Sequence, residues 1–125
     1  MRIKTVIILT LFLICIVMLI AWASIRKSTP SKLDGFAQCL KDKGAVFYGA
    51  FWCSHCQDQK KLFGTAKRLL LYVECSTPDG KGQRPVCALK KIEGYPAWDF
   101  ADGTREGGLL SLKKLAEKTG CILPT

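Results

Sequence analysis

The sequence lacks internal repeats, low-complexity tracts and long runs of like charge. Acidic residues are scarce, since 10 Asp and Glu stand against 19 Lys and Arg, a formal net charge of +9. The basic residues are scattered and no nucleic-acid-binding motif accompanies them. We therefore expect a solvated basic surface, or one near anionic headgroups, rather than a nucleic-acid-binding protein. The 125 residues leave room for one small domain and none for a second catalytic domain.

Charges are also missing from residues 6–23, VIILTLFLICIVMLIAWA. Basic residues precede this segment and follow it. A signal peptide cleaved after Ala23 and an uncleaved membrane anchor both fit the pattern. The length of the apolar run and the interfacial residue Trp22 favour the anchor. Membrane attachment through residues 6–23 is therefore predicted.

The composition changes after this segment and predicts three parts. Residues 1–23 form the signal-anchor or transmembrane segment, and the polar residues 24–32 form a linker. Residues 33–125 form the folded domain.

Cysteine is abundant, with 7 residues in the chain. Cys15 lies in the apolar segment, and the other six lie in the predicted domain. An even number behind an export-type segment indicates an oxidising compartment. The domain is therefore expected to face the periplasm, the extracellular side or an organelle lumen.

The hydrophobic pattern predicts helices interleaved with short strands. Such an order indicates an α/β sandwich with a central mixed sheet. The expected helices are 33–43, 53–70, 86–92 and one that begins at Ser111; the expected strands are 45–52, 71–74, 96–100 and 105–109.

The sequence WCSHC, residues 52–56, stands where the first strand is expected to meet a helix. A cysteine at a helix N-terminus is near unpaired backbone N–H groups and the positive end of the helix dipole, which stabilise a thiolate. Cys53 is therefore the predicted nucleophile and Cys56 the cysteine that resolves the mixed disulfide. His55 lies between them and is expected to tune the redox potential. Half of a zinc site or a structural disulfide is the simpler alternative for this pair.

This motif, followed by Gly94-Tyr95-Pro96, resembles the thioredoxin superfamily. The resemblance covers roughly residues 33–122, a whole small domain. It implies a thioredoxin-like three-layer sandwich behind the N-terminal membrane helix, and no diffusible cofactor or metal. It also implies a cis-proline at Pro96 facing the cysteine pair, with Tyr95 beside it pairing with an extended substrate segment. Trp52 is expected to border the same site.

A closer resemblance is to the thioredoxin-like domain associated with vitamin K epoxide reductase homologues. It is suggested by FYGAFWCSHC, by YVEC around Cys75, by the Cys87 region and by GYPAWDF. Those domains pass electrons from substrate thiols to a quinone-reducing membrane partner. One N-terminal segment stands here in place of the four-helix reductase domain, so the resemblance implies a partner acting in trans.

The four remaining cysteines are candidates for accessory disulfides. Cys75 and Cys87 match the additional pair of that family, and either a structural bridge or an exchangeable electron relay fits them. Cys39 and Cys121 are expected to bridge the two ends of the domain or to be buried free thiols.

One departure from thioredoxin concerns the strand before the motif. Thioredoxin has a buried acid there that helps to deprotonate the resolving cysteine, whereas AVFYGAFW, residues 45–52, has no acid. The residues that assist Cys56 are therefore not identified by the sequence.

The predicted function is disulfide exchange with protein thiol clients in the oxidising direction, as part of cell redox homeostasis. Two alternatives stay open: an extracytoplasmic protein-disulfide reductase, and a thiol-based metal-binding module or metallochaperone.

Overall fold

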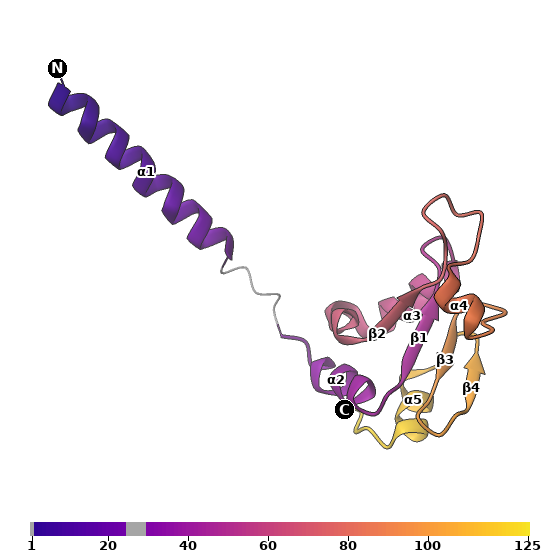
Figure 1. Cartoon of the computed structure of the whole chain (residues 1–125). Helices are drawn as coiled ribbons and strands as arrows, with labels where there is room; N and C mark the ends of the chain where they lie inside the picture. The colour runs from indigo at the N-terminus through magenta and orange to yellow at the C-terminus, as the bar shows by residue number, and fades with distance from the viewer. Residues whose placement is uncertain (1, 25–29) are drawn as a thin grey trace.

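The computed structural model describes residues 2–24 and 30–125, shown in Figure 1. The predicted linker, residues 24–32, lies largely outside the described residues. The described part contains an N-terminal helix and an α/β domain.

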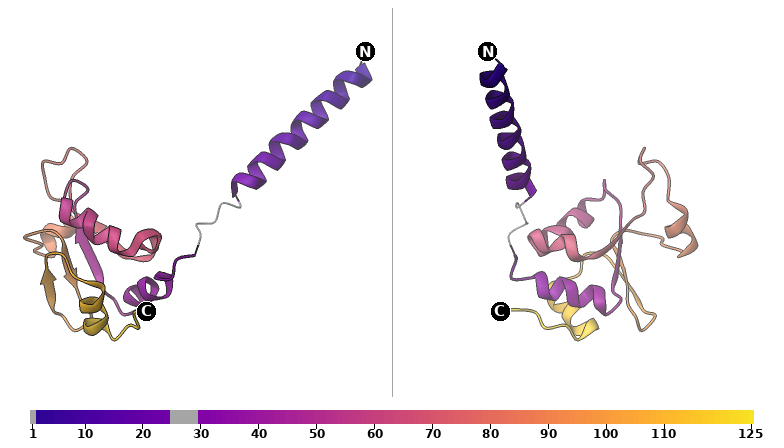
Figure 2. Two further views of the ribbon diagram at one scale, coloured as in Figure 1. Left: turned by 180° about the vertical axis from the view of Figure 1, so that it is seen from behind. Right: turned by 60° about the vertical axis from the view of Figure 1, so that its left-hand side comes forward.

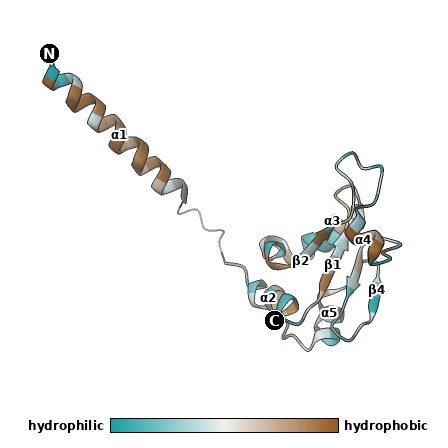
Figure 3. Cartoon of the chain, viewed as in Figure 1, coloured by the Kyte–Doolittle hydropathy of each residue, from teal (hydrophilic) through white to brown (hydrophobic). Residues whose placement is uncertain are grey.

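Helix α1 (Arg2–Ser24) contains a segment, Arg2–Trp22, of 21 residues with a mean hydropathy of 2.9 and no buried side chains. Figure 3 shows α1 coloured as apolar along most of its length, with hydrophilic residues at its N-terminal end. A helix that is apolar all round suits a lipid environment rather than one face of a soluble core. The helix is long and apolar enough to span a bilayer.

Four short strands form the sheet of the domain in the order β2-β1-β3-β4. The central strand β1 pairs in parallel with β2, where Phe47 faces Tyr72, and antiparallel with β3, where Phe47 faces Trp98. The β3 and β4 strands form an antiparallel hairpin. The strands are β1 (Val46–Gly49), β2 (Leu71–Glu74), β3 (Ala97–Asp99) and β4 (Arg105–Gly107).

Helices cover both faces of this sheet. One face packs against α2 and α3 through Phe36 and Phe63, and against α5 through Leu115. The other face carries a smaller core, in which Cys87 of α4 packs near Tyr48. Figure 2 shows α2 and α3 on one side of the strands and the orange α4 on the opposite side. The helices are α2 (Asp34–Asp42), α3 (Ser54–Phe63), the 3-10 helix η1 (Gly64–Leu69), α4 (Pro85–Leu89) and α5 (Leu112–Thr119).

This arrangement is a three-layer, thioredoxin-like sandwich with a central mixed sheet, so the fold class predicted from the sequence is confirmed. The helix predicted from Ser111 is also found. The Ser111 hydroxyl accepts a hydrogen bond of 3.1 Å from the Lys114 N–H, and Gly120 ends α5 in the left-handed conformation.

Several predicted elements were wrong in extent. The helix expected over 86–92 ends at Leu89, and the strand expected over 105–109 ends at Gly107. The strand expected over 45–52 ends at Gly49, because the chain turns there and the Cys53 N–H donates to the Ala50 carbonyl at 3.0 Å. The helix expected over 53–70 breaks at Gly64, whose φ of 54° and ψ of −128° are not helical, and continues as η1.

A buried glutamine ties α3 to the segment before α5. Gln59 is fully buried, its amide donates to the Leu110 carbonyl at 3.0 Å, and its carbonyl accepts from the Leu110 N–H at 2.8 Å. Both hydrogen-bonding groups of Leu110 are satisfied in this way.

Candidate active site

The turn from β1 into α3 carries the Cys-x-x-Cys motif. Cys53 is the N-cap of α3, in extended conformation, and its sulfur accepts a hydrogen bond from the Cys56 N–H at 3.2 Å. The side chain of Cys53 is 8% exposed and that of Cys56 is fully buried. Both thiols are buried, but Cys53 is the more exposed of the two, and its sulfur accepts the Cys56 N–H at the start of the helix.

The surroundings of Cys56 disfavour its ionised form. Burial is the largest cause that raises the pKa of Cys56, followed by its hydrogen bond with Cys53. In the opposite direction, a backbone hydrogen bond at Ala50 lowers this pKa, and the charge of Lys60 lowers it to a smaller extent. A raised pKa means that the protonated form of the Cys56 thiol is favoured, so a nearby positive charge is needed to stabilise its thiolate.

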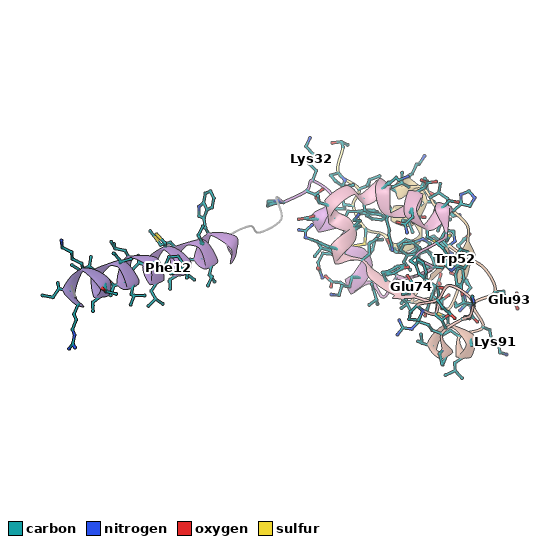
Figure 4. The ribbon with its side chains drawn as sticks, turned by 90° about the horizontal axis from the view of Figure 1, so that it is seen from above. Phe12, Lys32, Trp52, Glu74, Lys91 and Glu93 are labelled. Carbon is teal, nitrogen blue, oxygen red and sulfur yellow. A yellow bond between two sulfur atoms is a disulfide. The ribbon has the colours of Figure 1, made fainter. Side chains whose placement is uncertain are left out.

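Glu74, at the end of β2, holds the turn before the motif. Its carboxylate accepts hydrogen bonds from the backbone N–H of Phe51 at 3.2 Å and of Ser76 at 2.9 Å. The Tyr72 hydroxyl donates to the other oxygen of Glu74 at 2.7 Å. Glu74 and Trp52 are labelled in Figure 4, where they lie near each other in projection.

Trp52 borders the site on the side of the loop after β2. Its ring is 56% exposed, and its indole N–H donates to the Ser76 hydroxyl at 2.9 Å. The loop residue Gly80 approaches this ring closely, since an added Cβ would lie 3.7 Å from Trp52 Cδ1. The loop therefore supports one face of an accessible aromatic ring.

Tyr95 and Pro96 lie beside Trp52. The Tyr95–Pro96 peptide bond is cis, and Pro96 is fully buried. The rings of Trp52 and Tyr95 meet edge to face, with centroids 5.9 Å apart. The Tyr95 hydroxyl accepts a hydrogen bond from the Gln83 amide at 2.8 Å. The contact between Trp52 and Tyr95 thus joins the segment before Cys53 to the segment with the cis-proline.

His55 is less closely associated with the thiols. Its side chain is exposed, and among the described residues no hydrogen bond joins it to Cys53 or Cys56. Its charge acts on Asp58, whose pKa is lowered mainly by a hydrogen bond from Lys61 and to a smaller extent by His55. The tuning role of His55 stays a prediction.

The other four cysteines of the domain are paired in the structure. Cys39 of α2 is bonded to Cys121 after α5, with Cα atoms 5.9 Å apart. Cys75 after β2 is bonded to Cys87 of α4, with Cα atoms 5.6 Å apart. Cys53 and Cys56 are free thiols, as is Cys15.

No three His, Cys, Asp or Glu side chains are gathered as metal ligands anywhere in residues 2–24 and 30–125. A metal bound by the motif would have to take its remaining ligands from elsewhere.

Sequence reasoning missed Lys60, Tyr72 and Glu74, which lie around Cys56 or its turn. Lys60 had a local signal, because a residue four positions after Cys56 lies on the same helix face. Glu74 had none, because its partner Phe51 is 23 residues away in the sequence.

No family model matches the chain. The chain is similar to the thiol-disulfide oxidoreductase LTO1 of Arabidopsis thaliana, with 48% identity over 104 residues. The match takes in 79% of this chain and 27% of the plant protein, so the chain spans about a quarter of that relative.

Proposed function

We propose that this protein is a membrane-tethered, extracytoplasmic thiol–disulfide oxidoreductase that exchanges disulfides with protein thiols through Cys53 and Cys56. One observation carries the proposal: Cys53 caps α3 and keeps 8% of its surface exposed, while Cys56, one turn further on, is fully buried. The similarity to a plant thiol-disulfide oxidoreductase supports the same chemistry.

The exchange proceeds through a mixed disulfide at Cys53. In the oxidising direction, a client thiolate attacks Cys53 of the Cys53–Cys56 disulfide, and Cys56 leaves as a thiolate that takes up a proton. A second client thiolate then attacks the client sulfur of the mixed disulfide, and Cys53 leaves. The client gains a disulfide, and the cysteine pair gains two electrons. The burial of Cys56 directs the attack to Cys53.

Trp52, Tyr95 and Pro96 are proposed to hold the client chain. The edge-to-face contact between Trp52 and Tyr95 and the cis bond before Pro96 support this proposal. An extended client segment can then pair with the backbone beside Pro96 while an apolar side chain packs on Trp52.

We further propose that the pair is re-oxidised by a vitamin K epoxide reductase-like membrane partner linked to quinone. The resemblance of the sequence to domains with such partners supports this step. The apolar helix α1 supports it too, because an anchor would keep the domain at the membrane where the partner resides.

Trapping the mixed disulfide tests the proposal. The full chain in detergent micelles, with Cys15→Ala to remove the third free thiol, is compared with and without Cys56→Ala. Incubated with a client that carries a disulfide, the Cys56→Ala variant should accumulate a mixed disulfide, because the Cys53 thiolate displaces one client sulfur and no second thiol resolves the product. A Cys53→Ala variant should accumulate none. The proposal fails if neither variant changes the rate at which a reduced, unfolded client protein is oxidised.

The client assay also shows the direction of electron flow, and metal analysis of the same protein tests the metal-binding alternative. Faster reduction of a client disulfide than oxidation of client thiols would indicate a reductase. A stoichiometric metal that survives dialysis, with no turnover of client, would indicate a metal-binding module.

A further inference from the structure

The buried thiol of Cys56 poses a chemical problem that the strand before it does not solve. In thiol–disulfide exchange the attacking species is the thiolate, so Cys56 must lose its proton before it can resolve a mixed disulfide. Its side chain is fully buried, and strand β1 offers no acid nearby. Another group has to favour the charged form.

Tyr72 of β2 shares a small space with Cys56 above Gly49. A Cβ placed on Gly49 would lie 3.1 Å from Cys56 Sγ, 3.0 Å from Tyr72 Cε2 and 3.3 Å from the Tyr72 oxygen. Glycine at this position allows the sulfur and the ring to approach the same point of the strand.

Lys60 reaches this space from α3. It follows Cys56 by four residues and so lies on the same face of the helix. Its ammonium lies 3.6 Å from the centre of the Tyr72 ring, a cation–π contact. Lys60 is half-buried, so its charge is less screened than that of an exposed lysine.

Glu74 fixes the other side of the Tyr72 ring. Because the Tyr72 hydroxyl donates to Glu74 at 2.7 Å, the ring cannot turn freely. Glu74 is itself held by the N–H groups of Phe51 and Ser76. Ammonium, ring and carboxylate therefore form one ordered group beside the buried thiol.

Lys60 and Cys56 each shift the pKa of the other toward its charged form. Burial lowers the pKa of Lys60, and the negative groups Glu74 and Cys56 raise it. Burial is the largest cause that raises the pKa of Cys56; a backbone hydrogen bond at Ala50 lowers it, and the charge of Lys60 lowers it to a smaller extent. The titratable groups that act on this pair from the surrounding elements are Cys53, Lys67, Tyr72 and Glu74.

We propose that Lys60 is a positioning residue for the resolving step: its ammonium, held over Tyr72 and balanced by Glu74, stabilises the Cys56 thiolate. This inference rests on the proposed redox function of Cys53 and Cys56. It assigns to a lysine of α3 the help that a buried acid gives in thioredoxin.

In the resolving step, the Cys56 thiol first loses its proton to water. The thiolate attacks Cys53 Sγ, the Cys53–Cys56 bond forms and the bond from Cys53 to the other sulfur of the mixed disulfide breaks. In the oxidising direction that sulfur belongs to the protein that re-oxidises the pair; it leaves as a thiolate and takes up a proton from water. Lys60 stays protonated throughout and exchanges no electrons.

A two-phase thiol assay isolates this step. The reduced full chain carrying Cys15→Ala is mixed in micelles with 5,5′-dithiobis(2-nitrobenzoate), and release of the coloured thiolate is followed with time. The first release reports attack by Cys53, and the second reports attack by Cys56 on the mixed disulfide. A Cys56→Ala variant abolishes the second release.

Lys60→Gln keeps a polar chain of similar shape but removes the charge. For each unit by which the pKa of Cys56 rises, the fraction of Cys56 present as thiolate at a given pH falls about tenfold. The remaining thiolate is more nucleophilic and reacts about threefold faster, which offsets part of this loss. We therefore expect the second phase to slow about threefold per unit in the range where its rate rises with pH, and the pH profile to move to higher pH. Lys60→Arg should restore the profile.

Lys61→Gln is the matched control. Lys61 is the next residue, its side chain is 75% exposed, and its partner is the surface residue Asp58. Both phases should be unchanged in this variant, because an exposed pair contributes little. A circular dichroism melt confirms that each variant is folded, and Lys60→Met replaces Lys60→Gln if the latter is not.

The outcomes separate the two proposals. An unchanged second phase and pH profile in a folded Lys60→Gln variant, with a normal first phase, overturns the role of Lys60 alone. A parent chain that shows no second phase and forms no Cys53–Cys56 disulfide by mass spectrometry overturns the proposed function itself.

Discussion

The two disulfides of the structure predict different consequences when each is removed. Cys39–Cys121 joins α2 to the chain after α5, on the face of the sheet covered by the larger core. Cys75–Cys87 joins the end of β2 to α4, next to Ser76, which hydrogen-bonds the Trp52 indole. We compare two double variants of the full chain. One carries Cys39→Ala together with Cys121→Ala, and the other carries Cys75→Ala together with Cys87→Ala.

The expected losses of stability follow from the loops that the bridges close. The sequence separations are 82 and 12 residues. The chain-entropy relation then gives about 4.5 kcal/mol for Cys39–Cys121 and about 2.8 kcal/mol for Cys75–Cys87. Both double variants remove the same atoms, so the difference of about 1.7 kcal/mol is the better-defined quantity.

Activity should follow the opposite order. The Cys75–Cys87 bridge fixes the start of the loop that supports Trp52, whereas the other bridge lies at the far ends of the domain. We therefore expect slower client oxidation after loss of Cys75–Cys87, and an unchanged rate after loss of Cys39–Cys121 in the fraction that remains folded.

Urea unfolding in micelles, followed by tryptophan fluorescence, measures the free energies of unfolding, and the client assay measures the rates. The reasoning is refuted if removal of Cys75–Cys87 costs more stability than removal of Cys39–Cys121. It is also refuted if both double variants oxidise the client at the same rate.

Two further substitutions test the packing around the site. Gln59→Leu leaves the N–H and C=O of Leu110 without partners and should lower the free energy of unfolding by about 2–4 kcal/mol, as measured by urea denaturation. A loss below about 0.5 kcal/mol would contradict the role given to these two hydrogen bonds. Gly49→Ala places a methyl group against Tyr72 and the Cys56 sulfur, so it should cost about 1–3 kcal/mol and alter the second phase of the thiol assay more than the first. Equal effects on the two phases would speak against the close approach at Gly49.

Local signals predicted much of the fold and the centre of the site. The apolar run at 45–52 identified the central strand, and the motif identified the start of α3, because both depend on hydrophobic pattern and on helix-terminus chemistry within a few residues. Gly120 and Ser111 bounded the last helix for the same reason. The strand was too long in the prediction because an apolar composition does not reveal a turn at Ala50.

The rest of the site depends on contacts between distant segments. Glu74 meets Phe51 across 23 residues, and Gln59 meets Leu110 across 51. A polar residue on a helix reads as exposed unless its partner is known, so Gln59 was not predicted to be buried. The pairing of strands β1 and β2 brings Glu74 to the turn that contains Phe51, and no residue pattern within either strand encodes this contact.

The reduction potential of the Cys53–Cys56 pair tests the central claim most directly. It is measured for the full chain with Cys15→Ala in micelles, equilibrated against glutathione buffers, with Cys56→Ala as the control that cannot form the disulfide. We predict a reversible two-electron couple with a potential well above that of thioredoxin, toward the roughly −120 mV of a strong oxidant. A potential near roughly −270 mV would contradict the oxidising direction, and the absence of a reversible couple would contradict the redox function itself.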